Sequence, residues 1–174
     1  MVETEQGGRV ANRSGRWLED LIYNTLKTQA GYDEITPHEK KMLVRQDGVL
    51  RIEDTDKWFC RQLRLERNLY GAKYTSDFYL YDFEKWPDGL HVEAKWQNSS
   101  GSIDEKYVFT ALSLISFKAP TMMILAGGGA RQGAVQWLTQ QGRKSGFIFI
   151  NGLDEFNMWA QRNYFFRNYF RRRG

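Results

Sequence analysis

The segment that decides the fold reads LHVEAKWQ over residues 90–97. Successive side chains of a β-strand point to opposite faces, so this segment has one apolar and one polar face. The apolar face carries Leu90, Val92, Ala94 and Trp96. The polar face carries His91, Glu93, Lys95 and Gln97. The pattern predicts a strand that is buried on one face and presents an acid and a lysine together on the other.

A second strand is predicted immediately upstream, over residues 75–81. Residues 86–89 read WPDG, a strong turn signal, so the two strands are expected to form an antiparallel hairpin. In the upstream strand, alternation groups Thr75, Asp77, Tyr79 and Tyr81 on one face and Ser76, Phe78 and Leu80 on the other. The hairpin is expected to bring Asp77 beside Glu93.

Asp77, Glu93 and Lys95 together predict a particular chemistry. Two neighbouring carboxylates repel each other, and a divalent cation with hard oxygen ligands, typically Mg²⁺, relieves that repulsion. Hydrolysis of a phosphodiester requires an activated water and compensation of the charge that develops on the phosphoryl oxygens. A metal-bound water and the adjacent ammonium meet these two needs. The alternative is a same-face ion pair of Glu93 and Lys95, worth only a few tenths of a kcal/mol.

The rest of the chain predicts an α/β fold. A helix capped by Ser14 has apolar residues at helical spacing over 17–26, and short strands follow between residues 42 and 82. Ser102 and Glu105 form a capping box at the start of a second helix. After it the pattern predicts a strand over 121–126, a glycine turn, a helix near 134–141, a strand over 147–150 and a last helix from about residue 154. This order indicates a mixed sheet flanked by helices.

Ser76-Asp77, followed after a hairpin by Glu93-Ala94-Lys95, resembles the motif of the PD-(D/E)XK nuclease superfamily. Glu19 on the first helix, Gln97 beyond the lysine and the helix start at residues 101–106 extend the resemblance. It implies a restriction-endonuclease-like fold, with an α-β-β-β-α-β core and an extra C-terminal helix, strand and helix. Ser76 departs from the family pattern, which has proline at this position.

The resemblance also implies roles for individual residues. Asp77 and Glu93 would ligate Mg²⁺, for which Mn²⁺ would substitute, with the Ala94 carbonyl as a further ligand. Lys95 would orient or deprotonate the attacking water. Glu19 would act through a bound water or as a ligand of a second metal ion, and Gln97 would help to hold the nucleophile.

The distribution of charge favours a polyanionic partner. The formal net charge is +4, and no acid follows Glu155. Arginines interleaved with aromatic residues, as at this end of the chain, suit a phosphate backbone. The candidate DNA contacts are Lys106, Arg131, Arg162, Arg167, Arg171, Arg172 and Arg173. The alternative for the terminal arginines is a final helix that packs its aromatic residues on the core and ends in a solvated tail.

Composition bounds the class of protein. Of the 174 residues 41% are hydrophobic and 15% aromatic, enough to fill a core. We expect residues 1–174 to form a single domain, with a flexible N-terminus over 1–12 and a basic, aromatic C-terminal segment over 155–174. A single cysteine, Cys60, fits a reducing compartment. With no leader peptide and no membrane-length apolar run, a cytoplasmic location is expected, in a bacterial or phage-infected cell.

These observations favour a Mg²⁺-dependent endonuclease that cuts double-stranded DNA at specific sites, of the restriction or homing type. A homodimer is expected, because two active sites must reach two antiparallel strands. One alternative is a structure-selective nuclease that resolves Holliday junctions or branches and reads DNA shape. A second is a DNA-binding module without catalytic activity, and a third is a basic α/β protein with no nucleic-acid role.

Overall fold

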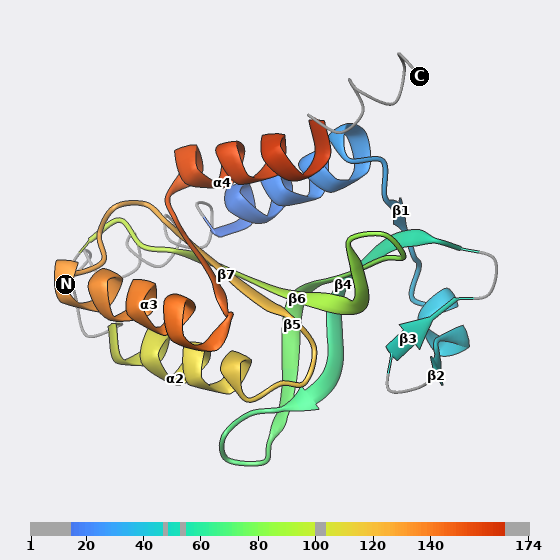
Figure 1. Cartoon of the computed structure of the whole chain (residues 1–174), viewed down its shortest axis with the longest axis horizontal. Helices are drawn as coiled ribbons and strands as arrows, with labels where there is room; N and C mark the ends of the chain where they lie inside the picture. Colours follow the sequence, from blue (N-terminus) through green and yellow to red (C-terminus); the bar gives the residue numbers. More distant parts are fainter. Residues whose placement is uncertain (1–14, 47–48, 53–54, 100–103, 166–174) are drawn as a thin grey trace, which may run out of the picture.

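A mixed six-stranded sheet forms the centre of the molecule in the computed structural model, which describes residues 15–46, 49–52, 55–99 and 104–165. The strand order is β1-β4-β5-β6-β7-β8 (Figure 1). The strands are β1 (Asp33–Glu34), β4 (Lys57–Arg67), β5 (Lys73–Asp82), β6 (Trp86–Trp96), β7 (Thr121–Ala126) and β8 (Ile148–Asn151). This arrangement confirms the predicted α/β fold of the restriction-endonuclease-like type.

The sheet is antiparallel in its first half and parallel in its second. β4, β5 and β6 pair antiparallel in sequence order, as a meander, whereas β6, β7 and β8 pair parallel. Parallel neighbours need a crossover connection, usually a helix. The helices α2 (Asp104–Ile115) and α3 (Gln132–Ser145) supply the two crossovers.

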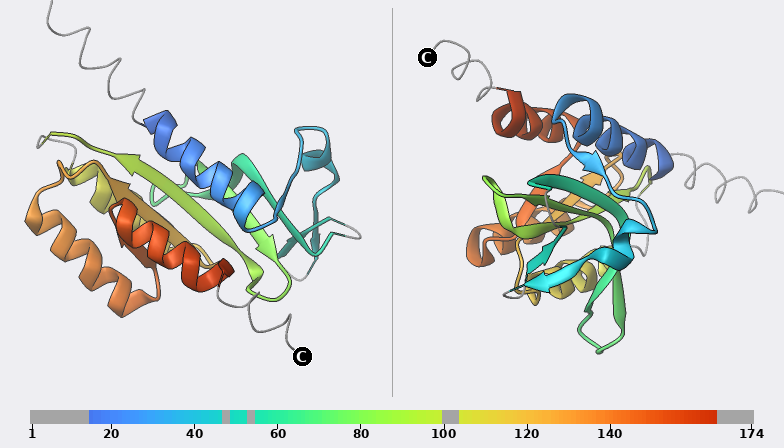
Figure 2. Two further views of the ribbon diagram at one scale, coloured as in Figure 1. Left: turned by 90° about the horizontal axis from the view of Figure 1, so that it is seen from above. Right: turned by 90° about the vertical axis from the view of Figure 1, so that its right-hand side faces the viewer.

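Helices cover both faces of this sheet. Residues 15–24 form an α-helix that continues into a π-helical turn, η1 (Thr25–Gln29), and this N-terminal helix lies beside α4 (Leu153–Ala160) on one face (Figures 1 and 2). A further π-helical turn, η3 (Gln161–Phe165), continues α4. Helices α2 and α3 lie on the opposite face. The N-terminal helix buries Leu18, Ile22 and Leu26, spaced four residues apart, which is the expected stripe of an amphipathic helix.

A smaller unit packs against β4 and β5 of the sheet. It consists of the 3₁₀ turn η2 (Glu39–Met42) and the two-stranded sheet of β2 (Val44–Gln46) and β3 (Val49–Arg51). Ile35 and Leu50 from this region pack against Trp58 and Tyr81 of the main sheet. This apolar cluster covers the part of β4 and β5 that the long helices leave uncovered.

The turn of the predicted hairpin lies earlier than expected. β6 already begins at Trp86, and the connection to β5 is made by residues 83–85. The reason is Asp82, whose Oδ1 accepts hydrogen bonds from the backbone amides of Glu84 and Lys85, at 3.0 and 3.1 Å. An aspartate that holds the amides after it is a strong turn former. The WPDG segment is therefore the start of β6, with the register shift between Leu80 and Asp82.

Several sequence predictions fall on residues outside the described ranges. These are the flexible segment 1–12, the two helix caps at Ser14 and Ser102, and the end of the basic C-terminal segment from residue 166 onward. Among the described residues, no helix has both the length and the apolar character to cross a lipid bilayer.

Candidate active site

Strand β6 has the two faces that its sequence predicts. Leu90 and Val92 are buried in the cluster beneath the N-terminal helix, and the Trp96 ring meets that of Trp17 edge to face at 5.4 Å. On the other face His91 and Glu93 are both at least 95% buried. The alternation in residues 90–97 therefore predicts correctly which side chains belong to the polar face.

Strand β5 does not alternate as predicted. Phe78 packs in the cluster under the N-terminal helix, as expected. Ser76, however, lies with His91 on the opposite face, where its Oγ is 2.8 Å from the His91 Nδ1. Tyr79 contacts the same imidazole, with ring centroids 4.8 Å apart. Ser76 and Tyr79 share a face although they are three positions apart, which in a regular strand would place them on opposite faces. The alternation therefore breaks at Asp77, and the predicted grouping of Ser76 with Phe78 is wrong.

The carboxylate of Asp77 is fixed where this break occurs. Its Oδ2 accepts a hydrogen bond of 2.9 Å from the backbone amide of Ala94 and lies 3.7 Å from the Nζ of Lys95. Its Oδ1 accepts a hydrogen bond of 3.3 Å from the Gln62 side chain of β4. Asp77 is thus held by one hydrogen bond from β4 and one from β6. The donor on β6 lies within residues 90–97, the segment beside which the sequence predicts Asp77.

Glu93 and Lys95 form a close ion pair in which the lysine Nζ donates to Oε1 of Glu93. Burial raises the pKa of Glu93, and the negative charge of Asp77 raises it further, while Lys95 opposes both effects. For Lys95, burial alone would lower the pKa, but the charges of Glu93 and Asp77 outweigh it and the pKa rises. Lys95 is thus close to both carboxylates, and the two roles expected of it, orienting the attacking water or deprotonating it, remain predictions.

Tyr74 is a member of this cluster that the sequence pattern does not predict. Its buried hydroxyl is close enough to Glu93 to affect the pKa of that carboxyl but makes no hydrogen bond of regular geometry among the described residues, and its ring packs edge to face on Phe117 at 5.3 Å. Burial raises the pKa of Tyr74 far above its usual value, and the negative charge of Glu93 raises it further. Tyr74 lies three residues before Asp77, but strict alternation would have placed it on the face opposite the site.

The donor set fits one divalent cation of the magnesium type. Oε2 of Glu93 is buried and makes no hydrogen bond of regular geometry to any residue that the structure describes, despite the nearby Tyr74. A buried carboxylate oxygen without such a partner is costly, and a cation relieves that cost. No three acidic, histidine or cysteine side chains converge within the described residues. A metal ion here would therefore take the carboxylates of Asp77 and Glu93, with the Ala94 carbonyl and water completing its shell.

Glu19 reaches the same place from the N-terminal helix. Partial burial raises its pKa, and the charge of Asp77 adds to the rise while Lys95 opposes it. These interactions show that the predicted helical acid lies near the two sheet residues. The two roles expected of Glu19, contact through a bound water and ligation of a second metal ion, both remain predictions.

The side chain of Gln97 makes hydrogen bonds within the fold that its predicted role does not require. Its Nε2 donates to the carbonyls of Ser99 and Gly129, at 2.8 and 3.3 Å, and its Oε1 accepts from the hydroxyl of Tyr107. Gly129 packs so closely here that a Cβ would lie 2.3 Å from the amide nitrogen of Ser99. These contacts join the end of β6 to α2 and to the glycine turn after β7. A part for Gln97 in holding the nucleophile remains a prediction.

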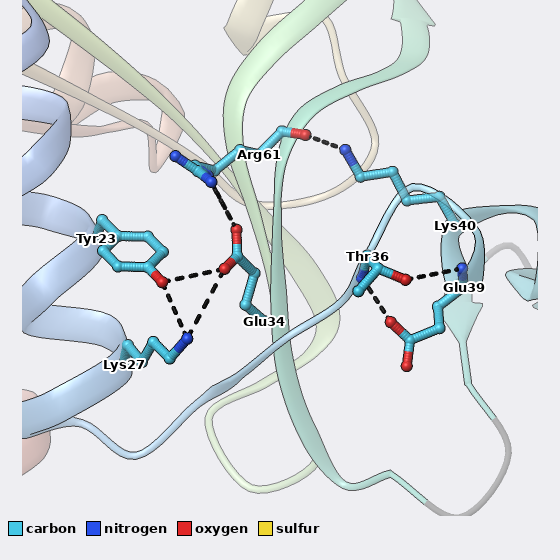
Figure 3. A network of polar contacts seen from close by, with 7 residues as sticks. All are labelled: Tyr23, Lys27, Glu34, Thr36, Glu39, Lys40 and Arg61. Carbon is cyan, nitrogen blue, oxygen red and sulfur yellow. Dashed lines mark hydrogen bonds and ion pairs between the residues drawn. The ribbon is translucent and has the colours of Figure 1, made fainter.

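A cavity of about 450 Å³ opens next to Gln62, which binds Asp77. Its lining includes Glu19 and Gln62, which adjoin Asp77, together with Arg61 and Glu34. Figure 3 shows how its polar wall is built: the Arg61 guanidinium binds Oε1 of Glu34 at 2.9 and 3.0 Å, and the Tyr23 hydroxyl binds the other oxygen at 3.1 Å. These side chains are already paired, so the wall is close to electrically balanced.

The predicted DNA contacts are divided between described and undescribed residues. Lys106 in the first turn of α2, Arg131 just before α3 and Arg162 in η3 are all exposed. Arg131 also lies 3.4 Å from a carboxylate oxygen of Asp104. The remaining candidates, which lie outside the described ranges, are Arg167, Arg171, Arg172 and Arg173.

Comparison with known protein families agrees with this arrangement. The family model described as PD-(D/E)XK nuclease superfamily domain matches residues 10–164. Neither the curated proteins nor the solved structures include a significant match. The matched range contains Glu19, Asp77, Glu93, Lys95 and Gln97. On this match, which spans most of the sequence, the chain belongs to the PD-(D/E)XK nuclease superfamily.

Proposed function

We propose that this protein is a metal-dependent endonuclease that hydrolyses phosphodiester bonds of double-stranded DNA. The observation that carries the proposal is the convergence of two carboxylates and one ammonium at the break in β5. Asp77 lies 3.7 Å from Lys95, and Lys95 binds Glu93 directly. Membership of a nuclease superfamily supports the reaction class.

The chemistry divides between a bound cation and the chain. Mg²⁺ held by Asp77 and Glu93 would polarise the phosphoryl group and lower the pKa of a bound water. The carboxylates keep their positions through the Ala94 amide and the Lys95 ammonium. Lys95 carries a positive charge that offsets the charge developing on the phosphoryl oxygens. Its side chain is 32% exposed, so it reaches the solvent from which a substrate arrives.

Attraction of the DNA backbone to the protein rests on the basic surface residues. Lys106 and Arg131 are exposed at or near the starts of α2 and α3. A helix start offers free backbone amides to a phosphate, and a neighbouring cation adds to that attraction. We further propose a site-specific enzyme of the restriction or homing type that acts as a homodimer, because each chain supplies one site and duplex DNA has two strands.

Incubation of the purified protein with three DNAs tests these proposals. The substrates are supercoiled plasmid, long linear DNA and a four-way junction, each with Mg²⁺, with Mn²⁺ or with EDTA. Discrete metal-dependent fragments would support site-specific cleavage, whereas cutting confined to the junction would replace it by resolution of branched DNA. Salt-sensitive binding without cutting under any divalent cation would overturn the enzymatic proposal in favour of a DNA-binding module.

A further inference from the structure

We propose that Gln62 of β4 is a positioning residue that fixes the direction of the Asp77 carboxylate. The inference rests on the proposed function only in taking Asp77 as a metal ligand. Gln62 lies on the strand next to the motif, fifteen residues before Asp77. It is exposed and lines the cavity beside the site, so packing in the core does not require a glutamine there.

The backbone of Gln62 has an unusual conformation. Its φ is +53°, and it is the only non-glycine residue with positive φ in the described part of the chain. The left-handed region is disfavoured for a residue with a Cβ, more so within a strand. Such a conformation persists where its surroundings hold it, and it occurs disproportionately at functional sites.

This conformation coincides with the break at Asp77. The flanking pairs in the β4–β5 register are Arg61 with Phe78 and Leu63 with Ser76, so Gln62 lies directly across from Asp77. Cys60 and Leu63 pack in the same apolar cluster although they are three positions apart, which in a regular strand would place them on opposite faces. The alternation of β4 therefore breaks at Gln62, just as that of β5 breaks at Asp77. Paired breaks at opposed positions let the two strands stay in register while Asp77 turns toward β6.

The side chain of Gln62 completes the arrangement. Its Nε2 donates to Oδ1 of Asp77 at 3.3 Å, while the Ala94 amide donates to Oδ2 at 2.9 Å. One donor comes from each neighbouring strand, so rotation of the carboxylate would break at least one hydrogen bond. An amide donor orients the carboxylate without neutralising it, which leaves its charge for a cation. Gln62 thus holds a ligand in place and needs no contact with substrate.

Two variants separate the backbone role from the side-chain role. Glycine adopts φ of +53° without a steric penalty, so Gln62→Gly is expected to raise the melting temperature of the metal-free protein by about 2–4 °C. It also removes the amide donor, so the Kd for Mn²⁺ should rise on the order of 3-fold to 10-fold, the loss expected for one hydrogen bond. Gln62→Ala keeps the Cβ and loses the donor, and should weaken Mn²⁺ binding equally without the gain in stability.

Arg64→Gly is the matched control, because Arg64 is another exposed residue of β4 and lacks the positive φ. Glycine in an ordinary strand position is destabilising, so this variant should melt earlier and bind Mn²⁺ like the wild type. Mn²⁺ binding is measured by titration calorimetry on the DNA-free full chain, and melting by circular dichroism. Plasmid cleavage across Mn²⁺ concentrations should show a shifted midpoint for both Gln62 variants and near wild-type rates at saturation.

The expected signature is that stability rises while metal affinity falls in Gln62→Gly, which a purely structural residue would not produce. Wild-type Mn²⁺ affinity and an unshifted midpoint in both Gln62 variants would overturn the positioning role and leave the proposed function intact. A wild-type protein that neither binds Mn²⁺ nor cuts DNA would overturn both.

Discussion

Oδ2 of Asp77 lies 3.7 Å from Nζ of Lys95, and the same oxygen accepts the backbone amide of Ala94. Ala94 and Lys95 of β6 thereby both contact one carboxylate oxygen of Asp77, which belongs to β5, the other strand of the hairpin. The arrangement explains how a buried acid, Glu93, is accommodated next to a second acid. Lys95 binds one carboxylate directly and lies close to the other, so the cluster carries one net negative charge when all three groups are ionised.

Lys95→Ala should reduce plasmid cleavage at least about 100-fold, because it removes the cation that faces the developing phosphoryl charge. The fold should remain, since the lysine side chain is partly exposed. Salt-sensitive DNA binding, measured by fluorescence anisotropy, should stay near the wild-type value. Lys144→Ala, an exposed lysine at the end of α3, is the control and should cut normally. Cleavage by Lys95→Ala at the wild-type rate would contradict the role given to Lys95.

Metal binding should stabilise the folded protein. A cation that binds only the folded state at 100 times its Kd adds about 2.7 kcal/mol to the free energy of unfolding, which is a rise in melting temperature of about 5–10 °C for a chain of this size. Thermal melting with Mn²⁺ and with EDTA measures this rise. Asp77→Asn keeps an acceptor for the Ala94 amide but loses the charge, so its melting temperature should no longer respond to Mn²⁺. A full response in that variant would place the metal elsewhere.

Gln97→Ala should lower the free energy of unfolding by about 1–3 kcal/mol, because the Tyr107 hydroxyl and the Ser99 carbonyl lose their partner. Denaturant unfolding gives this value. If the role of Gln97 is structural, cleavage per folded molecule should change little at a temperature where the variant is fully folded. A loss of cleavage in the fully folded variant would instead support the predicted role in holding the nucleophile.

Cys60 should be chemically inert in the native protein. Burial raises the pKa of its thiol to about 12, compared with about 8.5 in an unfolded chain. Only the unfolded chain ionises between these values, so the thiol's contribution to stability is fully present below about pH 8.5 and declines as the pH rises toward 12. Alkylation by iodoacetamide at pH 8.5 should be slow in buffer and fast in urea. Equal rates in both would show that the β4 face is open to solvent.

The sequence predicts the order of the elements because most of them have strong local patterns. The stripe of Leu18, Ile22 and Leu26 and the apolar strand over residues 121–126 need no tertiary information to recognise. The motif at residues 93–95 adds the family resemblance, and the family match confirms it. Strands β2 and β3 are among the short strands expected between residues 42 and 82. Their separation from the main sheet depends on tertiary contacts, which local sequence patterns do not specify.

The predictions that failed depend on contacts between strands. Alternation assumes a regular strand, and β5 is irregular at Asp77, directly across from the residue of β4 with positive φ, Gln62. No local signal in the sequence marks a glutamine with positive φ. The same break places Tyr74 on the face of Glu93, so this residue cannot be identified by counting along the strand. The early turn at residues 83–85 follows from Asp82, which competes successfully with the WPDG signal.

The most direct test of the central claim is the rate of supercoiled plasmid cleavage as a function of Mg²⁺ concentration, for the wild type and for Asp77→Asn at equal concentration of folded protein. If Asp77, Glu93 and Lys95 form a metal-dependent nuclease site, the wild-type rate should rise to saturation with Mg²⁺ and vanish in EDTA. The variant should remain at least about 100-fold slower at every Mg²⁺ concentration. Equal rates for the two proteins, or wild-type cleavage that persists in EDTA, would contradict the account.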